Sequence, residues 1–274
     1  MHTPRILVLD LDGTTLTADR RIADVDLAAA KRLTAAGVRV TIATGRLFTG
    51  TRWVAQALGI EGSVAVMNGS EIIYIDTQHA SHGRYLHREL RPTIRRILSE
   101  HGVSTFLFES RRIHYAHRDE RLMPYLGIWT EDLCAHPDVL EHAPWDDVDE
   151  IVAVCAAGPA EAILAVQVAL RELGPEVQSV VFSTFEGEAF LKLRHAAEDK
   201  GTAMVRLAEE SGATAAECVA VGDWYNDVPM LKTAGRSFAM AHARDDVKAS
   251  AQEVLEASRD GGAIAEVARR VWDL

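Results

Sequence analysis

Short runs of hydrophobic residues alternate with longer amphipathic segments toward both ends of the chain. The run at 6–10 consists almost wholly of branched apolar residues, and comparable runs lie at 38–43, 63–67 and 217–221. Runs of this density favour strands that are buried on both faces of a parallel sheet. The alternation of strand and helix predicts parallel strands joined by right-handed crossovers.

The segments between these runs carry apolar residues at helical spacing, and several of them end at a glycine, as helices often do. A hairpin partner for the third strand is expected at 71–75, and the last strand is expected at 237–240. Helices are expected at 25–36, 47–58, 202–211, 228–234, 245–257 and 263–272.

The pattern changes in the middle of the chain. Residues 76–84 are polar and rich in histidine, and short strand-like and helix-like segments alternate beyond them. Parallel α/β patterning resumes later, so the middle stretch is interpreted as an inserted lid. The elements expected there are strands at 85–90, 103–108, 112–116, 150–156, 177–183 and 189–193, and helices at 92–101 and 159–173.

The sequence therefore predicts an α/β protein with two domains. A Rossmann-like core domain with a parallel sheet is expected to comprise residues 1–82 and 194–274. The inserted α+β cap domain is expected to comprise residues 83–193.

Acidic residues follow two of the predicted parallel strands. The first predicted strand ends in Asp10, with Asp12 two residues further on, and Asp223 and Asp227 follow the strand at 217–221. Ligands of open α/β sheets bind just beyond the carboxyl ends of the strands. Neighbouring carboxylates repel each other unless a cation or a shared proton offsets their charge. Mg²⁺ takes oxygen ligands of this kind, so the sequence predicts a magnesium site at this edge.

Three other polar positions allow two interpretations each. Thr44 ends the second strand, where it is either a helix N-cap or a ligand for an anion at a helix amino terminus. Asn68-Gly69 favours a tight turn, but Asn68 could also reach a substrate, because that turn lies at the same edge of the sheet. Lys200 begins a helix, where its charge opposes the helix dipole. It is either a solvated side chain or the partner of a nearby anion or carboxylate.

Composition narrows the class of function. The chain has 29 Lys and Arg against 40 Asp and Glu, a formal net charge of −11, which argues against binding of a nucleic-acid backbone. No apolar run approaches the ~20 residues of a membrane span. The three cysteines have no paired spacing, and the first residues lack the pattern of a signal peptide. A cytoplasmic protein without membrane or nucleic-acid partners is expected.

Some residues of the insertion are typical of functional sites but have simpler explanations. His114 and His117 have a spacing that metal ligands also show, yet on a strand they would point to opposite faces. We interpret them as ordinary surface histidines, together with His79, His82 and His87. Trp129 and Trp145 are expected in the core or at the interface of the lid.

Taken together, the motifs resemble those of the haloacid dehalogenase-like phosphohydrolases. The resemblance rests on Asp10-Leu-Asp12-Gly-Thr-Thr, Ala-Thr44-Gly-Arg46, Lys200-Gly and Gly222-Asp223-Trp-Tyr-Asn226-Asp227. The long insertion after Asn68-Gly69 resembles the Cof-type branch, whose members carry an α/β cap. The resemblance covers essentially the whole chain.

The resemblance implies a role for each motif residue. Asp10 would be the nucleophile that forms an aspartyl-phosphate, and Asp12 would be the general acid and base. Thr44 and Lys200 would complete the catalytic set. Mg²⁺ would be held by Asp10, Asp12, Asp223 and Asp227. The residues expected to contact the substrate are Thr44, Gly45, Arg46, Asn68, Gly69, Lys200 and Asn226.

The sequence departs from the family pattern near the metal loop. Trp224 stands where family members usually have a small residue, and Tyr225 follows it. His242 replaces an asparagine of the usual motif, and Arg194 to Asp199 is more charged than the usual turn. None of these changes removes a catalytic group.

The expected activity is Mg²⁺-dependent hydrolysis of small phosphorylated metabolites, with sugar phosphates as the substrate class. One alternative is a phosphosugar mutase that uses the same aspartyl-phosphate chemistry. The other is a non-catalytic phosphate-binding protein that has kept the fold.

Overall fold

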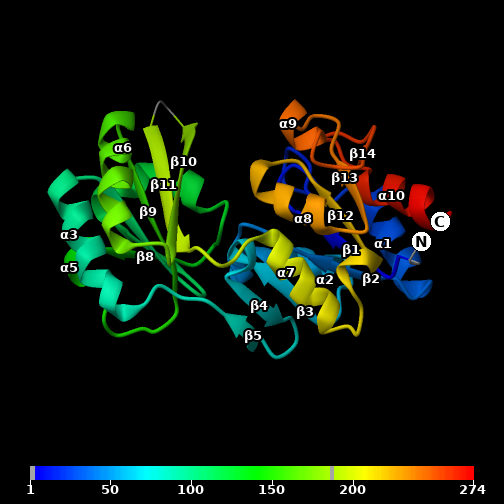
Figure 1. Ribbon diagram of the computed structural model, residues 1–274, viewed down its shortest axis with the longest axis horizontal. Helices are drawn as coiled ribbons and strands as arrows, with labels where there is room; N and C mark the ends of the chain where they lie inside the picture. Colours follow the sequence, from blue (N-terminus) through cyan, green and yellow to red (C-terminus); the bar gives the residue numbers. More distant parts are fainter. Residues whose placement is uncertain (1–3, 186–187) are drawn as a thin grey trace. The chain divides into compact units, whose positions relative to one another are not determined.

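The computed structural model describes residues 4–185 and 188–274. The contacts within the chain divide it into two compact units. Unit 1 is built from both ends of the chain, in blue and yellow to red in Figure 1, and most of unit 2 comes from the stretch between them. Unit 1 comprises the chain up to Gly45, Thr51–His82 and Glu198–Leu274; unit 2 comprises Arg46–Gly50 and Gly83–Ala197.

The centre of unit 1 is a five-stranded sheet in which all neighbouring strands are parallel. Its middle strands are buried apolar runs, as the hydrophobic pattern predicted. In spatial order the strands are β14 (Glu253–Val254), β13 (Arg236–Ala239), β12 (Cys218–Gly222), β1 (Ile6–Leu9) and β2 (Arg39–Ile42).

The register of β1 aligns the ends of three strands. Leu9 is opposite Val221 of β12 on one side and opposite Ile42 of β2 on the other. Asp10, Gly222 and Ala43 therefore follow at the same edge of the sheet. The loops after β1, β2 and β12, which contain predicted site residues, start from this edge.

A small hairpin sheet adjoins the edge strand β2. It contains β3 (Ser63–Val66), β4 (Glu71–Tyr74) and β5 (Ala80–Gly83), and β3 pairs with β4 in antiparallel register. A parallel bridge between Ala43 and Ala65 connects it to the end of β2. The hairpin expected at 63–75 is confirmed.

The prediction of a strand at 85–90 is wrong. The strand in this part of the chain is β5, the third strand of the hairpin sheet, and it lies in the preceding polar segment. Residues Arg88–Leu90 instead form a short 3₁₀ turn. The carbonyl of Leu86, which a strand would use in its ladder, accepts hydrogen bonds from the Arg91 guanidinium at 3.1 Å. Apolar residues in this segment thus mark burial against a core and not strand pairing.

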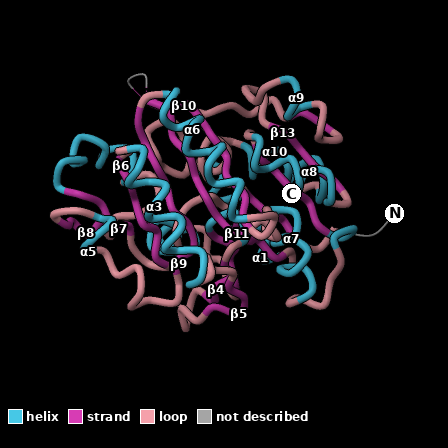
Figure 2. The backbone as a smooth tube through the Cα atoms, turned by 60° about the vertical axis from the view of Figure 1, so that its left-hand side comes forward, coloured by secondary structure: helices cyan, strands magenta, loops and turns pink. Residues whose placement is uncertain are grey.

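Helices of unit 1 flank the parallel sheet (Figure 2). Residues of α7 and α8 pack in one cluster with Ile6 and Val8 of β1, and α1 contacts α10. The helices are α1 (Asp24–Ala35), α2 (Phe48–Ala57) from Thr51 onward, α7 (Lys200–Glu209), α8 (Val228–Thr233), α9 (Asp245–Lys248) and α10 (Ala263–Trp272).

The helix expected at 245–257 is wrong beyond its first turn. After α9 ends at Lys248, the chain extends as β14 and pairs with β13. The amide of Leu255 donates to the carbonyl of Ala239 at 2.9 Å, and the amide of Gln252 donates to the Ser237 hydroxyl at 3.1 Å. Partners on the neighbouring strand therefore replace the helical hydrogen bonds.

Unit 2 contains a six-stranded sheet whose neighbours are antiparallel except for β7 and β8, and α3 and α6 lie over it (Figure 2). In spatial order its strands are β10 (Val177–Phe185), β11 (Glu188–His195), β9 (Ile151–Gly158), β6 (Ser104–Glu109), β7 (Ile113–Ala116) and β8 (Leu133–His136). Its helices are α3 (Arg91–His101), α4 (Met123–Leu126), α5 (Val139–His142) and α6 (Ala160–Ala169).

The fold class is the one that the sequence predicted, a parallel-sheet α/β core with an inserted α+β unit. Trp145 is buried in the core of unit 2, as expected. The edge strand β8 was not predicted, because its sequence lacks a dense apolar run.

The buried Arg91 organises unit 2 through backbone contacts. Its guanidinium donates to the carbonyls of Leu86, Trp145 (2.7 Å), Val148 (2.6 Å) and Asp149 (2.9 Å). A planar group with five donors can satisfy several carbonyls at once. One side chain thus connects the start of α3 to two loops.

We expect Arg91→Met to lower the free energy of unfolding by about 2–3 kcal/mol, because several buried carbonyls lose their donor. Urea unfolding followed by circular dichroism measures the change. The matched control is Arg95→Met on the same helix, where a partly exposed guanidinium contacts Asp146 at 3.4 Å. Equal unfolding midpoints for the two variants would contradict the role assigned to Arg91.

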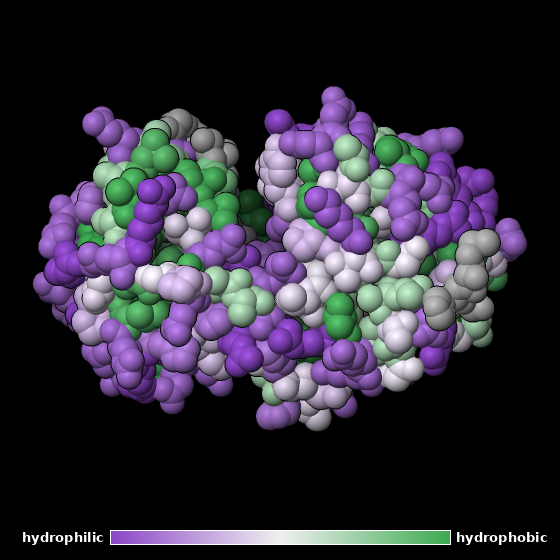
Figure 3. Space-filling model, viewed as in Figure 1, coloured by the Kyte–Doolittle hydropathy of each residue, from purple (hydrophilic) through white to green (hydrophobic). Residues whose placement is uncertain are grey.

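The surface of unit 2 carries exposed hydrophobic side chains over α6 and β10 (Figure 3). They are Leu164, Val168 and Val180. Within the described ranges, none of the helices has the length and apolar character needed to cross a membrane.

Candidate active site

Three buried aspartates meet at the carboxyl edge of the parallel sheet. The amide of Asp10 donates to the carbonyl of Val221 at 3.1 Å, which holds the loop after β1 beside the loop after β12. Carboxylate oxygens of Asp10, Asp223 and Asp227 all lie within 4.8 Å of one another. The structure therefore brings together three of the four acidic residues that the sequence identified.

Lys200 joins two of these carboxylates. It is the first residue of α7 and is 0% exposed, and its Nζ lies 2.5 Å from Oδ1 of Asp10 and 2.5 Å from Oδ1 of Asp227. The carboxylates compensate the unfavourable position of a cation at a helix amino terminus. The interpretation of Lys200 as a solvated side chain is wrong.

The start of α7 fixes the position of this lysine. Asp199 is the N-cap, and its side chain accepts from the amide of Thr202 at 2.8 Å, while the Thr202 hydroxyl accepts from the amide of Asp199 at 3.0 Å. This capping box satisfies amides that the first turn leaves open. The charged motif before Lys200 therefore has a local structural function.

Asp227 also organises the loop after β12. Its Oδ2 accepts hydrogen bonds from the amides of Asp223 at 2.9 Å and Trp224 at 2.8 Å. A side chain at Gly222 would place Cβ 2.5 Å from Cβ and Cγ of Asp227, so this position requires glycine. The loop thereby presents Asp223 toward Asp10.

The turn after β1 approaches Asp223 closely. Gly13 has φ +83°, and a Cβ on it would lie 2.3 Å from Oδ2 of Asp223. Thr14 donates to Oδ1 of Asp223 at 3.3 Å, and the Thr15 hydroxyl donates to the carbonyl of Asp10 at 2.6 Å. The Gly-Thr-Thr sequence therefore provides close approach and two anchoring hydroxyls.

Burial and mutual repulsion dominate the electrostatics of the cluster. The pKa of Asp10 is raised well above its usual value, first by burial and then by the charge of Asp227. Burial and Asp227 also raise the pKa of Asp223. Burial acts to lower the pKa of Lys200, but the charges of Asp10 and Asp227 outweigh it and the pKa is raised.

The donor set fits a divalent cation that prefers oxygen ligands. Within this group of four described side chains, one ammonium faces three carboxylates whose oxygens converge within 4.8 Å. Mg²⁺ is bound in proteins by carboxylate and other oxygen ligands of this kind. The excess of negative charge and the convergence of the oxygens are both consistent with such an ion.

A second group of polar residues lies at the ends of β2 and β3. The Thr44 carbonyl accepts from the amide of Asn68 at 2.8 Å, and Thr44 is fully buried. Asn68 is in the left-handed region (φ 57°), and its Oδ1 accepts from Nδ2 of Asn226 at 2.8 Å. A Cβ on Gly45 would lie 3.4 Å from the same Oδ1. Thr44, Gly45, Asn68 and Asn226 are thus neighbours.

The remaining predicted residues lie in other surroundings. Asp12 is exposed, and its charge contributes to the raised pKa of Asp10. A Cβ on Gly69 would lie 2.7 Å from the carbonyl of Asp199, so this glycine allows α7 to approach the turn. Arg46 belongs to unit 2, where its guanidinium donates to the carbonyl of Gly50 at 3.3 Å.

The sequence did not assign a contact to His242. Its Nε2 lies 3.2 Å from Oδ2 of Asp223, the side chain that also accepts from Thr14. The sequence signal that could have indicated this contact was the histidine in place of the asparagine of the family motif. Trp224 and Tyr225 are half exposed and meet edge to face, with ring centroids 5.5 Å apart.

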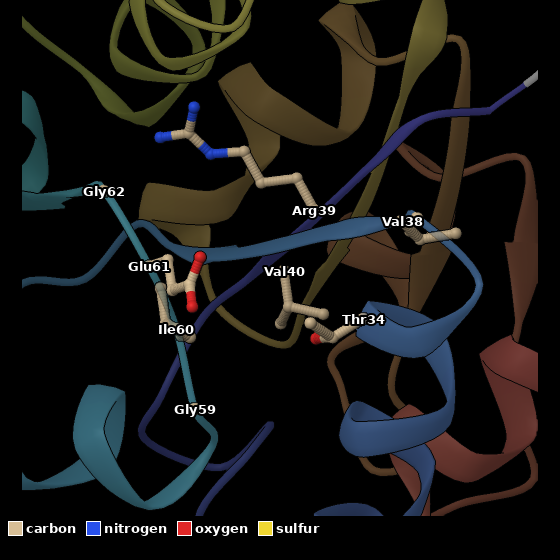
Figure 4. A pocket seen from close by; sticks show the side chains of 9 residues that line it. Thr34, Val38, Arg39, Val40, Gly59, Ile60, Glu61 and Gly62 are labelled. Carbon is tan, nitrogen blue, oxygen red and sulfur yellow. The ribbon is translucent and has the colours of Figure 1, made fainter.

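A surface pocket of about 410 Å³ lies elsewhere on unit 1. It is at the amino end of β2, opposite the end that carries Thr44, and Figure 4 shows its lining side chains on β2, at the end of α1 and after α2. It does not include the acidic cluster. The lining residues are Thr34, Gly37, Val38, Arg39, Val40, Gly59, Ile60, Glu61 and Gly62.

This fold and this site define a class: α/β enzymes with an acidic cluster at the carboxyl edge of a parallel sheet. Residues 7–267 match the family model described as haloacid dehalogenase-like hydrolase. The chain belongs to the haloacid dehalogenase-like hydrolases. It is an enzyme of the phosphatase class, as the sequence predicted.

Similar proteins cover nearly the whole chain. An HMP-PP phosphatase of Serratia proteamaculans is 30% identical over 249 residues, which are 89% of this chain and 86% of that protein. A crystal structure of a haloacid dehalogenase-like hydrolase from Bacteroides thetaiotaomicron is 25% identical, with a TM-score of 0.84. That match covers 98% of this chain and 100% of the other.

Proposed function

We propose that this protein is a Mg²⁺-dependent phosphatase of small phosphorylated metabolites that forms an aspartyl-phosphate on Asp10. The observation that supports the proposal most directly is the bridge that Lys200 makes between Asp10 and Asp227, beside Asp223. In phosphoryl transfer the protein mainly positions the reacting groups and neutralises their charge, and it supplies little covalent chemistry of its own.

Four residues would hold the magnesium ion. Asp10, Asp223 and Asp227 would contribute carboxylate oxygens, and Asp12 would contribute its backbone carbonyl. The bound ion supplies positive charge that neutralises the transferring phosphoryl group. The carboxylates of Asp10 and Asp227 also contact Lys200, which holds them in place.

In the first half-reaction, a carboxylate oxygen of Asp10 attacks phosphorus, and the bond from phosphorus to the leaving oxygen breaks. Asp12 gives its proton to that oxygen, which leaves as an alcohol. In the second half-reaction, Asp12 takes a proton from water as the water oxygen attacks the phosphorus. The bond to Asp10 then breaks, which releases phosphate and restores both carboxyl groups.

The neighbouring residues would bind the phosphoryl oxygens. Thr44 would donate its hydroxyl, and Lys200 would contribute its charge. Asn226 is held by Asn68 and would orient the phosphate or the lysine. Gly45, Gly69 and Arg46 complete the proposed substrate-binding set.

We propose that the inserted unit, at 83–193, acts as a lid that excludes water and selects the leaving group. The relatives named HMP-PP phosphatase support a small phosphorylated substrate. Sugar phosphates remain the substrate class that we propose. A panel of phosphorylated metabolites that includes sugar phosphates and HMP-PP tests this assignment.

Removal of metal ions is expected to abolish hydrolysis of p-nitrophenyl phosphate, and addition of Mg²⁺ is expected to restore it, because three buried carboxylates otherwise repel the phosphate. The measurement is phosphate release after treatment with EDTA and gel filtration, with and without added Mg²⁺. Full activity of the metal-free protein would contradict the proposal. Addition of Na⁺ at equal ionic strength is the control for salt effects.

The mutase alternative differs in where the phosphoryl group goes. A phosphatase releases phosphate from sugar phosphates without an activator. A mutase transfers the group to another position of the substrate and depends on a bisphosphate activator. The absence of isomerised product in a wild-type reaction would therefore support hydrolysis.

We expect Asp12→Asn to lower kcat for an alkyl phosphate by about 10²–10⁴-fold, because an amide cannot transfer the proton. With p-nitrophenyl phosphate the leaving phenolate needs no proton, so a stoichiometric burst of nitrophenol should remain before slow turnover. Rapid-quench kinetics measures both. Asp19→Asn, an exposed aspartate of the following turn, is the matched control. Turnover of Asp12→Asn near that of the wild type would refute the acid–base assignment.

A further inference from the structure

Unit 2 contains a cluster of metal-ligating side chains that the proposed reaction does not use. His114, Cys134 and His136 each offer one ligand atom, and the three atoms lie within 4.8 Å of one another. His114 is buried, and Cys134 and His136 are half-buried. The cluster consists of nitrogen and sulfur donors, unlike the oxygen donors around Asp10.

The pairing of two parallel strands creates this cluster. His114 of β7 is opposite Cys134 of β8, and Ala116 is opposite His136. Because side chains two residues apart point to the same face of a strand, Cys134 and His136 share a face. The sequence had placed His114 with His117, which is exposed and contacts Glu120.

The expectation that His114 is a surface histidine is therefore wrong. Only 4% of its side chain is exposed, and its Nδ1 lies 2.9 Å from Nε2 of His136. The sequence could not reveal this pair, because nothing predicted the edge strand β8.

Glu109 orients the central histidine of the cluster. Its Oε2 lies 3.0 Å from Nε2 of His114. When this carboxylate is ionised it only accepts hydrogen bonds, so a neutral His114 donates from Nε2 and directs the lone pair of Nδ1 to His136. A carboxylate behind a histidine is the common support of metal-ligating imidazoles.

Cys134 differs from the other cysteines. Burial raises the pKa of the Cys155 thiol to about 12 and that of Cys218 to about 11, so both keep their protons near neutral pH. Cys134 is half-buried, and all three are free thiols. The cluster thus contains the cysteine that solvent and ions reach most easily.

We propose that His114, Cys134 and His136 form a second metal site, which binds Zn²⁺ and links the edge strand β8 to β7. This site is independent of the proposed phosphatase function. Zn²⁺ prefers imidazole and thiolate ligands in tetrahedral geometry, whereas Mg²⁺ prefers oxygen. Three protein ligands leave the fourth position for water.

Binding exchanges protons for metal–ligand bonds. A bond from zinc to sulfur forms as the Cys134 thiol releases its proton to solvent. The proton between His114 and His136 moves to Nδ1 of His136, so that Nε2 of His136 and Nδ1 of His114 each bind the ion. The hydrogen bond from His114 to Glu109 is kept.

The first experiment uses the full-length wild-type chain, stripped of metal and kept in excess Mg²⁺ so that the acidic site is occupied. Addition of Co²⁺ as a probe is expected to produce a thiolate-to-cobalt charge-transfer band, which added Zn²⁺ removes. Zn²⁺ is also expected to protect one thiol from a thiol reagent. A cobalt spectrum without the thiolate band would overturn the proposal, because carboxylates alone cannot produce that band.

The second experiment compares variants by zinc titration and by metal analysis after gel filtration. Cys134→Ala and His136→Gln are each expected to weaken zinc binding at least about 100-fold, because two donors hold the ion much less tightly than three. Cys155→Ala and His117→Gln are the matched controls and should bind zinc as the wild type does. Circular dichroism verifies folding of each variant.

Equal zinc retention by the wild type, Cys134→Ala and His136→Gln would show that zinc binds elsewhere and would overturn the proposal. Zinc content is read separately from phosphatase activity. A protein that lacks phosphatase activity but shows the thiolate band would reject the proposed function and retain this metal site.

Discussion

Asp10→Asn is expected to lower kcat for phosphate release by about 10⁴-fold or more, the scale seen when a nucleophile is removed. The amide has the same shape but cannot form the aspartyl-phosphate. The variant also has one negative charge fewer beside Lys200. Steady-state hydrolysis of p-nitrophenyl phosphate at saturating Mg²⁺ measures the loss.

As a control, circular dichroism and the urea midpoint of unfolding verify that Asp10→Asn is folded. A second check uses acid quenching of the wild type with labelled substrate, which should trap a protein-bound phosphoryl group that the variant lacks. Activity of Asp10→Asn within tenfold of the wild type, in preparations free of contaminating phosphatase, would assign the nucleophile to another residue.

The central strands and their chemistry were predictable from local sequence. The runs at 6–10 and 217–221 are dense in apolar residues and favour buried strands, and the carboxyl ends of buried parallel strands lie at the edge of the sheet where ligands bind. The convergence of Asp10 and Asp223 follows from that rule. The fold class was predictable for the same reason.

Other features depend on partners far away in the sequence. Residues 245–257 have helical composition, but hydrogen bonds to β13 hold part of the second half in an extended conformation, in which Glu253–Val254 form the short strand β14. The local sequence around Lys200 is compatible with a solvated cation. Its two carboxylate partners come from the loops after β1 and β12, which are far away in the sequence. His114 pairs with His136 only because the edge strand β8 lies beside β7. Tertiary context overrides local propensity in each case.

Lys200→Met is expected to lower the free energy of unfolding in the absence of Mg²⁺ by about 3–5 kcal/mol, because removal of one partner leaves buried charges without compensation. Methionine keeps most of the volume of the fully buried side chain. Asp10, Asp223 and Asp227 then face one another without the ammonium. The same variant is expected to lose phosphatase activity, since the transferring group also loses this charge.

A double-mutant comparison separates the electrostatic effect from a packing defect. If repulsion among the carboxylates causes the loss of stability, adding Asp10→Asn to Lys200→Met removes one of the repelling charges and raises the urea midpoint. In the wild-type background, by contrast, Asp10→Asn removes a carboxylate that contacts Lys200. Saturating Mg²⁺ should raise the midpoint of Lys200→Met more than that of the wild type, because the ion replaces the missing positive charge. A midpoint that responds to neither change would assign the effect of Lys200→Met to packing and would remove Lys200 from the charge balance of the site.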